Sequence, residues 1–258
     1  MLIDSHCHLD MYSDEIRDDI VKNANSAGVK YMLNACAARK SFEKIIDITN
    51  KYDCVFGAIG QHPEEAEREG IVSKDELLSF ILKSKKIIAI GETGLDYSGE
   101  NFNRDLQIEN LINHIEVSQT TNLPIIIHNR DSNDDMTEIL SSQFKKKPFK
   151  AIIHCFTADK KMADAMLEFG FYISASGIIT FKGASDLRDV FKTLPLEKIL
   201  VETDSPYLAP VPFRGKTNEP AFVVETAKKL AEIMEKSFDE ISDTTSENFK
   251  RLFELDIK

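Results

Sequence analysis

The feature that most constrains the fold is a regular alternation between short apolar segments and longer amphipathic segments. Segments with the apolar character of buried strands occur eight times, at residues 2–4, 30–34, 55–59, 87–91, 124–127, 151–153, 171–174 and 199–202. Strands that alternate with helices form parallel sheets through right-handed crossovers. Eight such units in about 250 residues are the usual size of a TIM-type (β/α)8 barrel. We predict this α/β fold for residues 1–258, as a single domain.

The amphipathic segments carry signals for the ends of helices. Ser73-Lys-Asp-Glu76 has the spacing of a capping box, in which the Ser and Glu side chains bond to backbone N–H groups at a helix start. We also predict a helical C-terminal segment from Glu219 onward. Periodicity does not reveal whether a sheet closes on itself, so a doubly wound open sheet is the structural alternative.

The balance of charge limits the classes of partner. The chain has 43 acidic and 32 basic side chains, which give a formal net charge of −11. A field of this sign repels nucleic acid, so a polyanionic substrate would need a local cationic site. The hydrophobic content of 42% is ordinary for a globular protein and excludes a disordered tail.

The cysteines and the start of the chain favour a cytoplasmic location. The four cysteines have no C-x-x-C spacing and are too sparse for a disulfide framework. The first residues do not resemble a secretory signal, and no apolar run approaches the roughly 20 residues that cross a bilayer. We therefore expect reduced thiols, no membrane association and no obligate protein partner.

Residues that can bind metals are concentrated at the ends of the predicted strands. The side chains in question are those of His6, His8, Glu92, His128, His154 and Asp204. In a barrel the carboxyl ends of all strands surround one mouth, so residues far apart in the sequence can converge there. This distribution is the strongest indication of a functional site that the residues themselves provide.

The pair His6 and His8 is spaced for one metal ion. Side chains at positions i and i+2 of a strand point to the same face, so both imidazoles can reach one ion while Cys7 points away. Two histidines that only form hydrogen bonds inside the barrel are the other interpretation. The other four residues at matching strand ends favour the metal interpretation.

The number of candidate ligands favours two ions over one. Six imidazole and carboxylate ligands exceed what one tetrahedral site requires, and a carboxylate can bridge two cations. Paired divalent ions activate water for hydrolysis. Two such ions would also outweigh the charges of Glu92 and Asp204, so the loaded site would attract a phosphate locally.

Several sequence blocks carry a resemblance to a known family. They are Asp4-Ser-His6-Cys-His8-Leu9, Gly91-Glu92-Thr-Gly-Leu-Asp-Tyr97, Pro124-Ile-Ile-Ile-His128-Asn-Arg130, Ile153-His154-Cys-Phe156, Gly170-Phe-Tyr-Ile-Ser174, Glu202-Thr-Asp204-Ser-Pro-Tyr-Leu208 and Arg214-Gly-Lys-Thr-Asn-Glu-Pro220. In this order they resemble the TatD-type metal-dependent deoxyribonucleases of the amidohydrolase-like superfamily. The resemblance covers nearly the whole chain.

The resemblance implies which metal ion each of the six residues would bind. His6, His8 and Asp204 would hold one ion, His128 and His154 the other, and Glu92 would bridge them. Asp204 would also act as the general base toward the attacking water, with Glu92 as its catalytic partner. The ions would be Zn, Mn or Mg, because imidazoles favour the first two and carboxylates with phosphate suit the third.

The resemblance also implies a substrate and its contacts. The substrate would be DNA, single-stranded or at strand ends, cleaved by a 3′–5′ exonuclease type of reaction. Arg130 and the loop from Arg214 to Pro220 would face it, and Arg214 is the better candidate because a guanidinium binds two phosphate oxygens at once. His62 follows the third strand, and we expect it to contact substrate or to support a ligand.

Five further residues have expected supporting roles. Asp4 and Glu202 neighbour candidate ligands and could orient them, or could face away. Asp96 and Tyr97 should shape the loop beside Glu92. His114 lies within a predicted helix, where an ordinary surface or packing role is expected.

Two other function classes stay open. A barrel with the same centre could hydrolyse a small ester, lactone or amide, because activated water attacks whichever electrophile lies nearby. A non-catalytic barrel that binds metal or a partner protein is the second alternative, although the complete ligand set argues against it.

Overall fold

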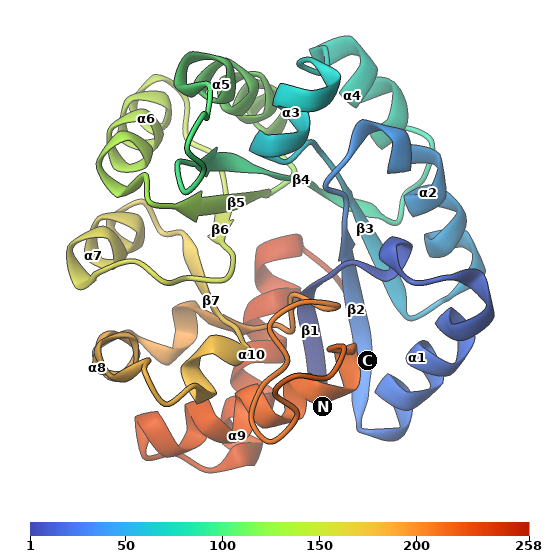
Figure 1. Cartoon of the computed structure of the whole chain (residues 1–258), viewed down its shortest axis with the longest axis vertical. Coiled ribbons are helices and arrows are strands. Elements are labelled where there is room, and N and C mark those ends of the chain that lie inside the picture. Colours follow the sequence, from blue (N-terminus) through green and yellow to red (C-terminus); the bar gives the residue numbers. More distant parts are fainter. Residues whose placement is uncertain (258) are drawn as a thin grey trace.

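The computed structural model describes residues 1–257 and forms a barrel of eight parallel strands in the order β1 to β8 (Figure 1). The strands are β1 (Leu2–Cys7), β2 (Val29–Ala35), β3 (Val55–Ile59), β4 (Ile87–Asp96), β5 (Ile125–Arg130), β6 (Ala151–Ile153), β7 (Tyr172–Ala175) and β8 (Ile199–Val201). The TIM-type fold predicted from the alternation is therefore confirmed, and the open-sheet alternative is excluded by the closure described below.

Helices lie outside the barrel, most of them in a ring around it and the last of them across one end (Figure 1). They are α1 (Asp14–Ser26), α2 (Phe42–Lys51), α3 (Pro63–Glu69), α4 (Lys74–Ile81), α5 (Arg104–Thr121), α6 (Asn133–Lys146), α7 (Lys160–Glu168), α8 (Ser185–Lys192), α9 (Val223–Met234) and α10 (Phe238–Phe253). Short 3-10 helices lie at Leu9–Met11, Arg39–Ser41, Gly177–Thr180, Leu196–Lys198 and Pro220–Phe222. The helical C-terminal segment expected from Glu219 onward is present as the last of these turns, α9 and α10.

The first and last strands meet through two backbone hydrogen bonds. The amide of His8 donates to the carbonyl of Ser205 at 2.8 Å, and the amide of Asp204 donates to the carbonyl of His6 at 2.9 Å. A bridge between Cys7 and Ser205 continues this pairing. The seam that closes the barrel is thus formed by the same residues that carry candidate ligands.

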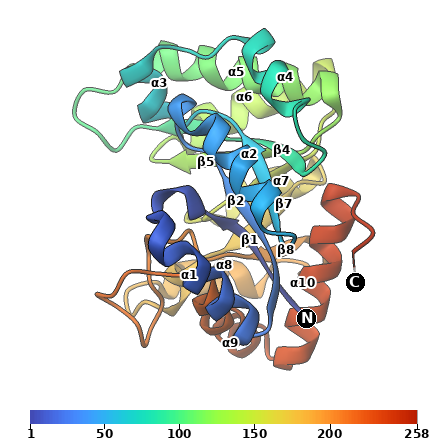
Figure 2. The same ribbon diagram turned by 90° about the vertical axis from the view of Figure 1, so that its right-hand side faces the viewer.

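Two layers of apolar side chains hold the barrel. Alternate residues of the strands, such as Ile3, Leu33 and Ile126, fill its interior together with Phe249 and Phe253 of α10. The residues between them face outward against the surrounding helices, as the period of two in a strand requires. Helix α10 therefore covers the amino-terminal end of the barrel, on the right in Figure 2, and leaves the opposite end to the loops.

Three strands extend at least three residues beyond the ends of their predicted apolar segments. β1 continues to Cys7, β4 to Asp96 and β5 to Arg130. Along β4 and β5 the ladder continues through Gly94 opposite His128. The polar residues at these ends interrupt the apolar pattern but not the backbone pairing. As a result, several candidate ligands lie within strands rather than after them.

The predicted capping box is half formed. The Ser73 hydroxyl accepts a hydrogen bond from the Glu76 amide at 3.2 Å and begins α4 as expected. The Glu76 carboxylate does not return to the backbone of Ser73, because it pairs with Arg39 at 2.6 Å instead. The ion pair with Arg39 thus takes the place of the bond from Glu76 to the backbone.

Two glycines allow β3 and β4 to approach closely at the mouth. A Cβ atom on Gly60 would lie 2.3 Å from the Cα of Gly91, and Gly91 has a φ of 128°. No side chain fits between these backbones, and only glycine readily adopts such a φ. The amide of Glu92, the next residue, donates to the carbonyl of Cys36 at 2.8 Å. Glu92 is held by this packing at the rim of the interior.

Within residues 1–257, no helix is both long and apolar enough to cross a membrane.

Candidate metal centre

Glu92 lies at the centre of the six residues, which the structure brings together at the carboxyl ends of the strands. Its Oε2 atom lies 3.2 Å from Nε2 of His6 and 3.5 Å from Nε2 of His8. Its Oε1 atom lies 3.0 Å from Nδ1 of His128 and 2.8 Å from Nε2 of His154. Each carboxylate oxygen therefore faces a different pair of imidazoles, and these groups could hold metal ions.

Asp204 lies with the first pair of imidazoles. Its Oδ1 atom is 3.4 Å from Nε2 of His8 and 3.7 Å from Nε2 of His6. The backbone of Asp204 has a φ of 56°, a left-handed conformation that aspartate tolerates better than most residues. Its side chain is 13% exposed, whereas that of Glu92 is 4% exposed. Asp204 is thus the candidate ligand carboxylate with the better access to a substrate.

The rings of His8 and His128 are oriented by acceptors outside the cluster. Nδ1 of His8 lies 2.9 Å from the Ala35 carbonyl, which can only accept, so this nitrogen carries the proton. Nε2 of His128 lies 3.1 Å from Asp96. In the neutral rings, the remaining nitrogen of each ring directs a lone pair at a carboxylate. Two such acceptors facing each other repel unless a cation lies between them, so the donor set fits divalent metal ions.

The third oriented imidazole is that of His154. Its Nδ1 atom lies 3.4 Å from Oε1 of Glu202, an ion-pair distance without a formed hydrogen bond, and its ring stacks on that of His6 at 4.0 Å. Among residues 1–257, Nδ1 of His6 has no hydrogen-bond partner although it is buried. Carboxylate partners behind imidazoles are the usual support of metal-binding histidines.

The imidazoles and carboxylates of the cluster shift one another's pKa values. Burial alone would lower the pKa of His8, but its hydrogen bond to Asp204 and the charge of Glu92 raise it to about 9. Burial would raise the pKa of Glu92, but His154 and the hydrogen bonds from three imidazoles hold it well below its usual range. The carboxylates are therefore ionised, and cations at this site replace the protons that the imidazoles otherwise take up.

His62 reaches the edge of the cluster as the residue that begins α3. Its Nδ1 atom accepts a hydrogen bond from the Glu64 amide at 3.3 Å, so the neutral ring carries its proton on Nε2. That nitrogen lies 3.7 Å from Oε1 of Glu92. Burial, together with the charge of His128, lowers the pKa of His62 to about 3. His62 thus presents a neutral N–H group beside Glu92.

The two candidate arginines lie on different sides of the mouth. Arg130 is the exposed last residue of β5, and Arg214 is exposed in the loop after β8. The guanidinium of Arg214 lies 3.8 Å from the centre of the Phe181 ring, a cation–π contact. In Figure 2 the loop after β8, in orange, projects to the left, as does the loop between β4 and α5.

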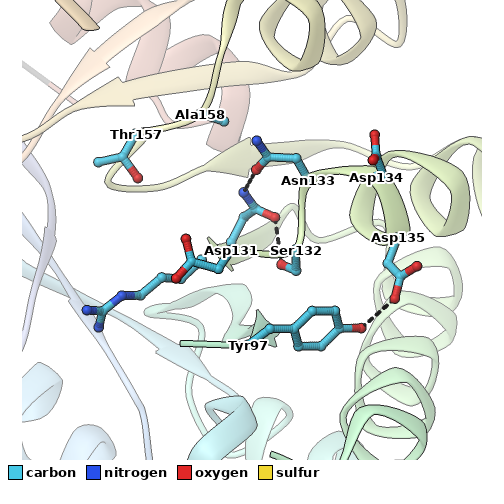
Figure 3. Close-up of a pocket in the computed structure, with 10 residues that line it drawn as sticks. Tyr97, Asp131, Ser132, Asn133, Asp134, Asp135, Thr157 and Ala158 are labelled. Atoms are coloured by element: carbon cyan, nitrogen blue, oxygen red, sulfur yellow. Dashed lines mark hydrogen bonds between the residues drawn. The ribbon is translucent and has the colours of Figure 1, made fainter. Parts of the chain in front are cut away.

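A pocket of about 530 Å³ lies beside the cluster, around the end of β5. Its lining includes Arg130 and the acidic residues Asp131, Asp134 and Asp135. Figure 3 shows the Tyr97 hydroxyl directed at Asp135, to which it donates a hydrogen bond at 2.8 Å. None of the six candidate ligands lines this pocket, so it is a neighbour of the cluster rather than the cluster itself.

Glu202, Asp4 and Asp96, which the sequence analysis gave supporting roles, have definite contacts. Glu202 supports His154, as expected, and also accepts from the Cys155 amide at 2.7 Å. Asp4 binds the backbone and hydroxyl of Thr203 at 2.9 and 2.6 Å, so it holds the end of β8. Asp96 bonds to the Ser98 amide at 2.9 Å and so shapes its loop. Its contact with His128 was not predicted, because the pattern placed the end of β4 at Gly91.

The structure decides between the surface role and the packing role expected for His114. It is fully buried, which excludes a surface role, and its Nε2 atom accepts a hydrogen bond from the Gln61 amide at 3.1 Å. Its Nδ1 atom lies 2.7 Å from the Asn110 carbonyl, to which it donates. His114 therefore packs against the turn that precedes His62. No motif marks this role, because the contact joins residues 53 apart in sequence.

The fold and this cluster of imidazoles and carboxylates are those of a metal-dependent barrel hydrolase, and comparison with known proteins supports that class. The family model described as TatD related DNase matches residues 3–254, so the chain belongs to the TatD family. The resemblance noted in the sequence is thereby confirmed.

Individual relatives match over nearly their whole length. The chain is 39% identical to "Uncharacterized metal-dependent hydrolase YcfH" of Escherichia coli K12, covering 99% of this chain and 96% of that protein. It is 37% identical to "Uncharacterized metal-dependent hydrolase YabD" of Bacillus subtilis, covering 99% and 100%. The crystal structure of YJJV, a TatD homologue from Escherichia coli K12, superposes with a TM-score of 0.93 at 27% identity, covering 99% and 98%.

Proposed function

We propose that this TatD-family hydrolase is a deoxyribonuclease that cleaves phosphodiester bonds at a two-metal centre. The observation that carries the proposal is the position of the Glu92 carboxylate. Its two oxygens face separate pairs of imidazoles at 2.8 to 3.5 Å. We assign His6, His8 and Asp204 to one ion and His128 with His154 to the other. Glu92 is the shared ligand.

The ions themselves are zinc, manganese or magnesium in this proposal, because the centre mixes imidazole with carboxylate ligands. When bound, two divalent ions lower the pKa of water and offset the charge of a phosphodiester. The protein provides their positions through Ala35, Asp96 and Glu202, which fix three of the rings. Rigid rings reduce the reorganisation needed when substrate arrives.

Asp204 is the proposed general base. Burial would raise its pKa, but the hydrogen bond from His8 and the charge of His6 lower it, so the carboxylate is ionised and able to accept a proton. Its partial exposure places it between the imidazoles and the solvent of the mouth. A base in this position can take the proton from the attacking water while it stays in contact with His6 and His8.

The proposed substrate contacts are Arg214, Arg130 and His62. Arg214 can bind two phosphate oxygens, and its guanidinium is already oriented against Phe181. His62 offers a neutral N–H group that can donate to a phosphate oxygen without adding charge. These donors supply the local attraction that a chain of net charge −11 otherwise lacks.

We further propose that the substrate is single-stranded DNA or a strand end, cleaved as by a 3′–5′ exonuclease, and that the enzyme works in the cytoplasm. The family name and the sequence blocks support the choice of DNA. Buried thiols such as Cys7 and Cys36 fit a reducing compartment.

The test is hydrolysis of end-labelled single- and double-stranded DNA by metal-stripped protein after Mg²⁺, Mn²⁺ or Zn²⁺ is restored. We expect metal-dependent cleavage, and a loss of about 10²- to 10⁴-fold in Asp204→Asn, whose amide accepts no proton. Circular dichroism of the variant checks that the fold survives. Absence of cleavage by folded, metal-loaded protein would refute the proposal and favour a small ester, lactone or amide as substrate.

A further inference from the structure

An aromatic side chain that the proposed function does not use stands exposed beside the candidate metal centre. Tyr207 is 54% exposed, and the centre of its ring lies 6.3 Å from that of His8. Among residues 1–257, its hydroxyl has no hydrogen-bond partner. A large aromatic group left open to solvent next to a catalytic centre is available to a ligand.

The exposure of Tyr207 does not come from a loosely held loop. Its amide donates to the Asp204 carbonyl at 3.0 Å, and its carbonyl accepts from the Asn218 side chain at 2.5 Å. Asn218 is buried, and it also donates to the Thr203 carbonyl at 2.9 Å. The backbone that carries the ring is therefore fixed to the same segment that carries Asp204.

The loops on this side of the mouth carry unpaired cations. Lys182, Arg214 and Lys216 are exposed, and within residues 1–257 none of them forms an ion pair. Their two loops are joined, because the Val211 amide donates to the Thr180 hydroxyl at 2.9 Å. Proteins bind single-stranded nucleic acid by combining an aromatic ring, on which a base stacks, with cations that contact the phosphates. Here the exposed ring and the free cations lie on the same loop and on the loop joined to it.

The opposite side of the mouth has the reverse character. The pocket around the end of β5 is lined by Asp131, Asp134 and Asp135 with one arginine (Figure 3). Its exposed aromatic neighbour, Phe102, is already stacked on Tyr97 at 4.4 Å. Asp134 and Asp135 are paired with Lys161 and Arg104, whereas the cations on the side of Tyr207 have no acidic partner among residues 1–257. A polyanionic strand is therefore attracted more strongly to the side of Tyr207, and Arg130 is a single, weaker contact on the other side.

We propose that Tyr207 is a stacking platform for an unpaired base that lies one or two nucleotides from the scissile phosphate. From the centre, the strand then continues across the loops that carry Phe181 and Arg214. Nucleotides stacked as in one strand of a duplex rise about 3.4 Å each, so the 6.3 Å between the ring centres of Tyr207 and His8 corresponds to about two nucleotides. A base stacked there is not paired, which selects single strands and frayed ends. The inference rests on the proposed function and defines its substrate more narrowly.

The test compares two end-labelled single-stranded oligonucleotides. One carries ordinary nucleotides throughout, and in the other the three nucleotides at the cleaved end are tetrahydrofuran abasic analogues. The wild type should lose about 5- to 150-fold in kcat/KM without the bases, the equivalent of about 1–3 kcal/mol of stacking. Tyr207→Ala should lose the same factor on the ordinary strand and nothing further on the abasic one.

Two further variants keep the result interpretable. Tyr207→Phe retains the ring and should stay close to the wild type on both oligonucleotides. Phe102→Ala removes an exposed aromatic group from the acidic side and should leave the dependence on bases intact. Equal losses on both oligonucleotides in Tyr207→Ala, or no loss on either, would overturn the platform while leaving the nuclease in place. Cleavage of neither oligonucleotide by the wild type would refute the proposed function itself, and the platform with it.

Discussion

At the scale of single residues, the candidate centre depends on what lies behind its imidazoles. His8, His128 and His154 each turn one nitrogen toward a carbonyl or carboxylate outside the cluster and the other toward Glu92. This arrangement fixes the tautomers that metal binding requires. The supporting residues should therefore matter nearly as much as the proposed ligands.

Glu202→Gln tests that expectation. The substitution keeps the size of the side chain but removes the charge beside Nδ1 of His154, so the ring should be less well oriented. We predict a 10- to 100-fold loss of metal affinity, measured by calorimetry. The matched control is Glu197→Gln, because Glu197 is an exposed acid in the turn before β8. Unchanged affinity in Glu202→Gln would contradict the supporting role.

The sequence is sufficient to select the six candidate residues but not all of their partners. Histidines and acids at strand ends are recognisable because few other positions combine those residue types with an apolar strand. The contact between Asp96 and His128 is not predictable in that way, since it depends on β4 continuing to Asp96 beside β5. The acceptor of His8 is a backbone carbonyl, which no residue type reveals.

At the scale of elements, strand ends and helices hold the mouth from different sides. Helix α5 supports the turn after β3, because the neutral ring of His114 accepts from the Gln61 amide. The adjacent His62 begins α3 and faces Glu92. The supports of the site thus extend to a helix that carries none of the proposed ligands.

The protonation state of His114 should make stability depend on pH. Burial lowers its pKa to about 4, whereas an unfolded histidine titrates near 6.5. Between these values the unfolded state binds more protons, so stability falls as the pH falls through this window. The wild type should lose about 2 kcal/mol of unfolding free energy between pH 7 and pH 5 from this group. Denaturant titrations of the wild type and His114→Gln at both pH values measure it, and parallel losses in the two proteins would contradict the prediction.

The elements themselves follow from the sequence more fully than their ends do. The eight apolar segments correspond to the eight strands, because buried parallel strands consist of continuous apolar residues. Where polar ligands begin, the apolar pattern stops while the ladder continues, as in β1 and β5. Closure of the barrel rests on two backbone hydrogen bonds at His8 and Asp204, which periodicity does not encode.

At the scale of the whole molecule, the distribution of charge matters more than its sum. The net charge of −11 opposes DNA binding, yet free cations gather on the loops after β7 and β8. The arginine on the other side, Arg130, shares its pocket with Asp131, Asp134 and Asp135. A strand should therefore be attracted more strongly to the side of Arg214, with Arg130 as the weaker contact.

One substitution on each side of the mouth compares how strongly the two sides bind DNA. Arg214→Ala should weaken single-stranded DNA binding and reduce the slope of log K against log salt by about 0.7, the effect of one lost phosphate contact on a single strand. Arg130→Ala should change the slope less, because nearby carboxylates already oppose phosphate there. Fluorescence anisotropy at several salt concentrations measures both. A larger change of the slope in Arg130→Ala than in Arg214→Ala would contradict the proposed path of the strand.

The most direct test of the account is the number of ions that each chain holds, measured by elemental analysis of protein equilibrated with Zn²⁺ or Mn²⁺ and then freed of excess metal. We predict two ions per chain in the wild type and one in a variant that combines His128→Ala with His154→Ala, because His6, His8 and Asp204 remain around one oxygen of Glu92. A single ion in the wild type, or an unchanged content in the double variant, would contradict the two-metal centre.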